Sequence, residues 1–69
     1  MPSLPGIIRA RREQAGFTRT DFAAAIGKSY STVIAYERGD VEPPLHVIQR
    51  IACVLDVPLS ALLDGEVVA

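Results

Sequence analysis

The sequence predicts a small all-α domain of five helices. Proline and glycine divide the 69 residues into segments of about 8 to 12 residues, and apolar residues recur in them every three or four positions, as on one face of a helix. No part of the sequence has the pattern of paired strands. A composition of 49% hydrophobic and 22% charged residues is that of a folded chain rather than a disordered one.

The first helix is expected from Gly6 to Ala15, with Ile7 and Ile8 facing the core. Gly16 follows it, at the position where a left-handed residue ends a helix. The outward face is expected to carry a cluster of three arginines: Arg9, Arg11 and Arg12.

Polar caps and glycines bound the second and third helices. Thr18 is a good N-cap, so the second helix is expected to begin at Arg19 and to stop at Gly27. Ser29 caps the third helix, which runs to Gly39. The residues expected to face inward are Phe22, Ala23 and Ile26 in the second helix and Val33 and Tyr36 in the third.

Prolines open the last two helices. Pro44 fits the first turn of a fourth helix that ends near Leu55, and Pro58 opens a short fifth helix that ends before Gly65. Two apolar stripes on the fourth helix predict packing on two sides. The stripes are Leu45, Ile48, Ala52 and Leu55, and Val47, Ile51 and Val54.

The charges are unevenly distributed along the chain. Residues 1–38 carry a formal charge of +3 and residues 39–69 one of −4, within a net charge of −1. A basic half can present a positive face to a polyanion such as nucleic acid. A scatter of solvated charges is the alternative interpretation.

The sequence has few residues that could form a disulfide, bind a metal or act in catalysis. The chain has one cysteine, Cys53, and one histidine, His46, so neither an internal disulfide nor a metal site is expected. The sequence contains no nucleophile motif and no glycine-rich phosphate loop, so we expect neither an enzyme nor a cofactor. No apolar run is long enough to span a membrane, and a cytoplasmic protein is expected.

The run from Arg19 to Arg38 resembles a helix-turn-helix. Ala23 is small enough for the two helices to approach, Gly27 takes a backbone angle that is costly for other residues, and Val33 fills the angle between the helices. More narrowly, the chain resembles the phage repressor and Cro type, the Xre family, from Ile8 to Gly65. The matching residues are Ile8, Arg12, Gly16, Ala23, Gly27, Glu37, Arg38, Gly39, Pro43, Ala52, Leu62, Leu63 and Gly65.

This resemblance implies a compact lambda-repressor-like bundle whose third helix enters the major groove of double-stranded DNA. It also implies a structural ion pair between Arg12 and Glu37, with two independent surface charges as the alternative. The residues that it implies for DNA binding are Thr18, Arg19, Lys28, Ser29, Tyr30, Ser31, Ile34, Ala35 and Arg38.

Several of these positions depart from the family's usual residues. Arg19 stands where a glutamine is common, and an arginine there can hold a phosphate or read a guanine edge. The outward residues of the third helix favour an A/T-leaning half-site, because Ile34 and Ala35 offer apolar contact suited to thymine. Three alternatives stay open: Tyr30 as a ring that covers the second helix, Ile34 as a core residue and Lys28 as a solvated side chain.

The loop after the third helix is acidic. Many relatives have basic residues there, whereas this chain has Asp40, Val41 and Glu42. The sequence therefore predicts moderate affinity for DNA, falling steeply as salt rises.

A homodimer is expected, because the family's regulators usually pair through their last helix. Small domains without disulfides or structural metals also often gain stability by association. The expected interface residues are Val57, Leu59, Leu62, Leu63, Val67 and Val68. The predicted organisation is an N-terminal arm (1–5), a helix-turn-helix domain with a dimerising C-terminal helix (6–64) and a tail (65–69).

We therefore expect a sequence-specific, DNA-binding transcriptional regulator that binds a palindromic operator, either an autoregulated repressor or a restriction-modification controller. Two alternatives involve a protein partner. The chain could be the antitoxin of a toxin–antitoxin pair, or a protein-interaction module that has lost DNA binding, which the acidic loop would suit.

Overall fold

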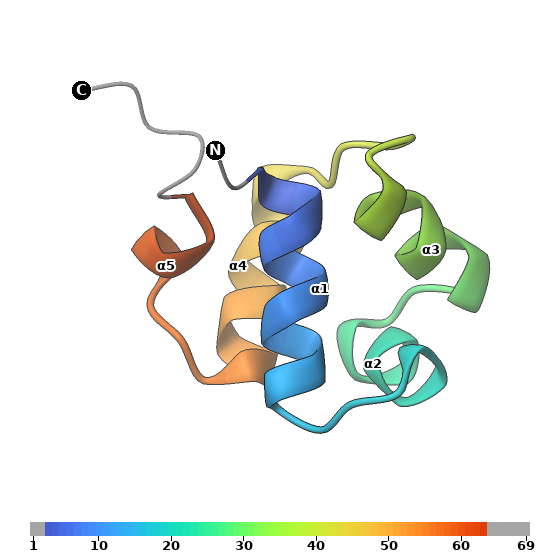
Figure 1. Cartoon of the computed structure of the whole chain (residues 1–69), viewed down its shortest axis with the longest axis horizontal. Coiled ribbons are helices and arrows are strands. Elements are labelled where there is room, and N and C mark those ends of the chain that lie inside the picture. The colour runs from blue at the N-terminus through green and yellow to red at the C-terminus, as the bar shows by residue number, and fades with distance from the viewer. Residues whose placement is uncertain (1–2, 64–69) are drawn as a thin grey trace.

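All five predicted helices are present in the computed structural model, which describes residues 3–63 (Figure 1). They are α1 (Leu4–Gln14), α2 (Arg19–Ile26), α3 (Tyr30–Arg38), α4 (Leu45–Leu55) and α5 (Leu59–Leu63). No strand occurs among the described residues. The all-α fold class is confirmed.

Helix α1 lies at the centre of the bundle. It packs against α3, α4 and α5, while α2 packs against α3 and α4. In Figure 1, the α2–α3 unit lies on one side of α1 and α5 on the other. The buried apolar residues come from every helix: Leu4, Ile8, Phe22, Ala23, Ile26, Val33, Tyr36, Val47, Ile48, Ile51, Ala52, Leu55 and Leu62.

The connection after α3 depends on the glycine at position 39. Gly39 has a φ of 81°, which L side chains rarely adopt. A Cβ atom there would also lie 3.4 Å from Cγ of Pro5 in α1. The glycine therefore lets α3 end close to the first turn of α1.

The start of α1 and the orientation of one arginine differ from the sequence prediction. The helix begins at Leu4 rather than at Gly6, because Pro5 fits a first helical turn and the Leu4 side chain is buried in the core. Two residues assigned to an N-terminal arm thus belong to α1. Arg12 is buried rather than outward, because it pairs with the buried carboxylate of Glu37. Pro44 is the N-cap of α4 and precedes its first turn.

Candidate nucleic-acid interface

Helices α2 and α3 are joined by a three-residue turn, and neighbouring residues in the sequence fix where each helix begins and ends. The Thr18 hydroxyl accepts a hydrogen bond from the Asp21 backbone N–H at 3.1 Å, and Ser29 Oγ accepts one from the Thr32 N–H at 3.2 Å. Gly27 ends α2 with a φ of 70°. Side-chain caps satisfy N–H groups that a helix start leaves without partners, so these residues fix where both helices begin.

Burial on the inner faces of α2 and α3 decides which residues face outward. Phe22 and Val33 are fully buried between the helices and the rest of the core. On the opposite face of α3, Tyr30 and Ser31 are exposed, whereas Ile34 and Ala35 are half-buried. The exposed residues among those expected at the DNA interface are Thr18, Lys28, Ser29, Tyr30, Ser31 and Arg38.

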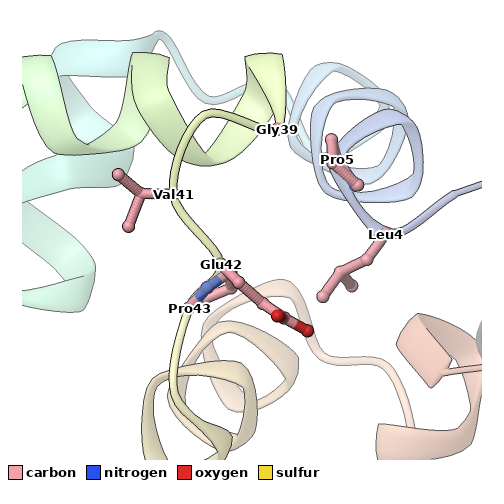
Figure 2. Close-up of a pocket in the computed structure, with 6 residues that line it drawn as sticks. All are labelled: Leu4, Pro5, Gly39, Val41, Glu42 and Pro43. Atoms are coloured by element: carbon pink, nitrogen blue, oxygen red, sulfur yellow. The ribbon is translucent and has the colours of Figure 1, made fainter.

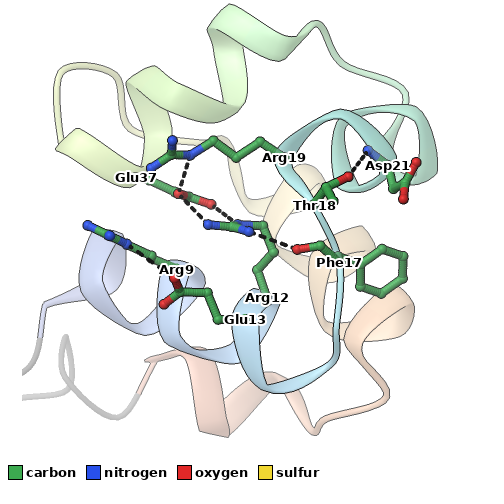
Figure 3. Close-up of polar contacts among 8 residues, drawn as sticks. All are labelled: Arg9, Arg12, Glu13, Phe17, Thr18, Arg19, Asp21 and Glu37. Carbon is green, nitrogen blue, oxygen red and sulfur yellow. Dashed lines mark hydrogen bonds and ion pairs between the residues drawn. The ribbon is translucent and has the colours of Figure 1, made fainter.

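A polar network lies at the junction of α1, α2 and α3 (Figure 3). Arg12 donates from Nε to Glu37 Oε2 at 2.6 Å and from Nη2 to Glu37 Oε1 at 3.3 Å. Its Nη1 donates to the backbone oxygen of Phe17 at 2.8 Å. Arg19 then donates from Nε to Glu37 Oε1 at 3.1 Å. The structure thus brings Arg12 and Glu37 together and adds Arg19 as a second cation on the same carboxylate.

The exposed fraction of these three side chains increases from Glu37 through Arg12 to Arg19. The side chain of Glu37 is 2% exposed and that of Arg12 is 8% exposed, but that of Arg19 is 35% exposed. Two guanidinium groups on one carboxylate leave an excess positive charge, and the more exposed group carries it toward solvent. The network therefore has a structural end at Arg12 and a solvent-facing end at Arg19.

The carboxylate of Glu37 also stabilises the charged form of Arg19. The hydrogen bond to Glu37, followed by the negative charge of that carboxylate, raises the pKa of the Arg19 guanidinium. Glu37 uses only the Nε hydrogen. A fixed guanidinium with its terminal groups left for other partners suits a phosphate or a base edge, because such forked contacts need a set orientation.

The acidic loop partly offsets the positive charge at the end of α3. Arg38 Nε lies 3.5 Å from Asp40 Oδ2, and both side chains are exposed. Screening by solvent keeps such a pair weak, so Arg38 can exchange Asp40 for another anion.

The same loop borders a hollow of about 180 Å³ against the start of α1 (Figure 2). In Figure 2, Leu4 and Pro5 face the loop from α1, whereas Val41 points away to the other side of the chain. The carboxylate of Glu42 extends over the hollow. This hollow carries an acid and apolar carbons, which do not suit a nucleic-acid phosphate.

The residues expected at a dimer interface separate into two groups. Leu62 is 0% exposed and lies inside the core of its own chain, so its side chain has no surface to offer a second copy, and its assignment to an interface is corrected. Val57, Leu59 and Leu63 are half-buried and pack at the edge of the core. Val67 and Val68 lie outside the described residues.

Sequence reasoning missed the bond between Arg19 and Glu37. The expected pair between Arg12 and Glu37 could have indicated this bond, since it places the Glu37 carboxylate close to the start of α2. It also left out His46 and Arg50, which line a hollow with Lys28.

The described residues contain neither a membrane-spanning helix nor a cluster of metal ligands. None of their helices is both long enough and apolar enough to cross a bilayer. No three of their His, Cys, Asp or Glu side chains are grouped closely enough to hold a metal ion.

Comparison with known proteins shows similarity that extends over most of the bundle. A family model described as helix-turn-helix matches residues 8–62. The uncharacterized HTH-type transcriptional regulator YazB of Bacillus subtilis is 39% identical over 59 residues, which are 86% of this chain and 86% of YazB. A protein of Pyrobaculum aerophilum named as an HTH-type transcriptional regulatory protein is 39% identical over 44 residues, 64% of this chain but 18% of that protein.

Solved structures of an epoxidase contain a similar bundle. The iron(II) form of HppE in complex with substrate has a TM-score of 0.80 and 33% identity, covering 87% of this chain and 34% of that one. Hydroxypropylphosphonic acid epoxidase from S. wedmorenis has a TM-score of 0.79 and 29% identity, covering 96% of this chain and 39% of that one. The chain thus spans little more than a third of these enzymes and under a fifth of the Pyrobaculum protein.

Proposed function

The chain belongs to the helix-turn-helix family of transcriptional regulators, and we propose that it binds double-stranded DNA sequence-specifically through the outward face of α3. The observation that carries this proposal is the network in which Glu37, near the end of α3, bonds to Arg19 at the start of α2. A guanidinium fixed at that point can hold a backbone phosphate while α3 enters the major groove.

In this binding mode the contacts divide by role. Thr18 and Ser29 cap their helices, so the backbone N–H groups and positive helix ends beside them can face phosphates. Base contacts fall to the outward residues of α3. Because Ile34 and Ala35 are half-buried, Tyr30 and Ser31 reach furthest. We propose an A/T-leaning half-site in which the Tyr30 ring and the exposed parts of Ile34 and Ala35 contact thymine methyl groups. The proposed phosphate contacts are Thr18, Arg19, Lys28, Ser29 and Arg38.

We further propose that the protein acts as a homodimer on a palindromic operator, as an autoregulated repressor or a restriction-modification controller in the cytoplasm. The half-buried Val57, Leu59 and Leu63 support an interface at the α5 end of the bundle. A dimer that binds such an operator is expected to place its two α3 helices one turn of DNA apart, about 34–36 Å.

The proposed activity is binding rather than catalysis. The likeness to the epoxidase covers about a third of that chain, so its chemistry is not carried over to this one.

Selection of bound duplexes from a random DNA pool at about 100 mM salt tests the proposal, since phosphate contacts alone hold poorly at that ionic strength. We expect enrichment of an inverted repeat whose half-site centres lie about 10 base pairs apart. Failure of a folded, dimeric protein to enrich any sequence would remove DNA recognition as its function.

A Leu63→Asp variant tests the proposed dimer interface. An unpaired carboxylate in an apolar contact costs several kcal/mol, so the dissociation constant of the dimer is expected to rise about 100-fold in sedimentation experiments. Leu45→Asp is the control, because Leu45 is 57% exposed on another helix. Dimers that persist in folded Leu63→Asp place the interface elsewhere, and Val57→Asp makes the same test if Leu63→Asp fails to fold.

A second candidate function is a protein-interaction module or antitoxin, favoured by the exposed apolar residues near the acidic loop. Val41 is 51% exposed and Leu45 is 57% exposed, and both flank Glu42 in sequence. An apolar pair beside an acid suits a partner protein better than a phosphate backbone. Absence of binding to random duplex even at low salt would favour this candidate.

A further inference from the structure

A second hollow, of about 260 Å³, lies between the C-terminal end of α2 and the first two turns of α4. Its walls combine two apolar residues, a glycine and three nitrogen-bearing side chains. The residues that line it are Ile26, Gly27, Lys28, His46, Val47 and Arg50. No carboxylate is among them.

The cations of this hollow are distinguished by having no acid to pair with. Four arginines in the described residues lie within ion-pair distance of a carboxylate: Arg9, Arg12, Arg19 and Arg38. In that same part of the chain, Arg11, Lys28 and Arg50 form no ion pair. Two of these three line the one hollow, so its positive charge is not offset locally.

The geometry brings Arg50 across from α4 to the turn after α2. Its Nη1 atom lies 3.9 Å from the position that a Cβ would take at Gly27. Lys28 lies in that turn, directly after Gly27. The guanidinium and the ammonium therefore approach the hollow from different elements, which is how a small anion is enclosed.

Helix α4 adds to the positive potential. Its N-cap is Pro44, which makes no side-chain hydrogen bond to the helix, and its first turn contains no acidic residue. No acidic side chain of the first turn thus neutralises the positive end of the helix dipole. His46 lies in this first turn and provides a ring N–H donor.

We propose that the Lys28–His46–Arg50 hollow binds a phosphate group. The arginine provides a forked donor, the lysine a point charge and the histidine a further N–H, beside the buried side chains of Ile26 and Val47. The phosphate has two candidate sources: the backbone of bound DNA, in which case the site rests on the proposed function, or a free phosphate ion or ester, in which case it stands apart from it.

Titration with inorganic phosphate tests the site without DNA. At constant ionic strength, we expect saturable shifts in the amide NMR signals of Gly27, Lys28 and Val47, with chloride as the reference anion. In Arg50→Gln, phosphate binding is expected to weaken at least tenfold. Arg11→Gln is the matched control, because it removes an unpaired cation from α1, outside the hollow. A non-saturating response, or a lower melting temperature in Arg50→Gln with phosphate binding intact, would overturn the proposal.

Binding of the selected DNA duplex distinguishes the two sources of the phosphate group. If the phosphate belongs to the DNA backbone, Arg50→Gln will lower the slope of log affinity against log salt by about one relative to Arg11→Gln. An unchanged slope with lost binding of inorganic phosphate identifies a free anion as the occupant. A parent protein that binds phosphate but no DNA contradicts the proposed function and leaves the phosphate site supported.

Discussion

A Glu37→Gln variant is expected to be less stable than the parent by about 3–5 kcal/mol, the usual effect of removing one partner from a buried ion pair. The loss is large because two guanidinium groups depend on the carboxylate and Arg12 is buried in the bundle. Glutamine keeps the shape and one acceptor oxygen. The variant therefore isolates the charge.

Thermal and urea unfolding, followed by circular dichroism, measure this effect. In a domain of this size each kcal/mol shifts Tm by about 4–8 °C, so a fall of more than about 12 °C is expected. Glu13→Gln is the control, because Glu13 pairs with Arg9 at 3.8 Å with both side chains more than half exposed, and such pairs contribute at most about 1 kcal/mol. Equal melting temperatures for the two variants would contradict the assigned role.

A second variant keeps the test decisive if Glu37→Gln does not fold. Combining it with Arg12→Met removes the cation that would otherwise be buried alone. Replacing both members of a buried pair is far less damaging than removing one, so the double variant is expected to regain stability over Glu37→Gln. Additive losses in the two single variants would instead mean that the two residues are not energetically coupled.

The helix boundaries could be predicted from sequence because their causes are local. Thr18 and Ser29 accept hydrogen bonds from N–H groups three residues ahead, and Gly27 and Gly39 adopt positive φ angles where each helix stops. These effects involve a few consecutive residues and need no knowledge of the tertiary fold.

Most departures from prediction depend on contacts between distant parts of the chain. Leu4 joins the core instead of an arm, and Leu62 is enclosed by its own bundle instead of lying at an interface. Arg12 is buried although arginine clusters usually lie in solvent, because Glu37 lies 25 positions away in sequence and bonds to it at 2.6 Å. Periodicity shows that a residue is apolar or polar, but the packing partner decides whether it is covered.

The candidate interface was predictable in outline but not in its electrostatics. The spacing of apolar residues in α3 indicates which positions turn outward. That Arg19 would share a carboxylate with Arg12 follows only from the way in which α1, α2 and α3 meet. The half-burial of Ile34 and Ala35 likewise depends on neighbouring helices.

An Arg19→Gln variant is expected to bind the selected duplex about tenfold more weakly at 100 mM salt, and to lower the slope of log affinity against log salt by about one, as for the loss of a phosphate contact. The effect follows from the position of Arg19, which is charged, only a third exposed and oriented by its bond to Glu37. If Arg19 reads a guanine edge instead, the loss will be confined to sequences that carry guanine at one position of the half-site.

Fluorescence anisotropy with labelled duplex at several salt concentrations measures both quantities. Arg19→Lys keeps the charge but lacks both the Nε–H that bonds to Glu37 and the terminal fork left for a phosphate, so it should retain the salt slope while losing part of the affinity. Arg11→Gln, which removes an exposed cation from α1, controls for the change in net charge. Equal affinity in Arg19→Gln and Arg11→Gln would show that Glu37 holds Arg19 for the stability of the bundle alone, and the phosphate contact would then have to come from another residue of the helix-turn-helix.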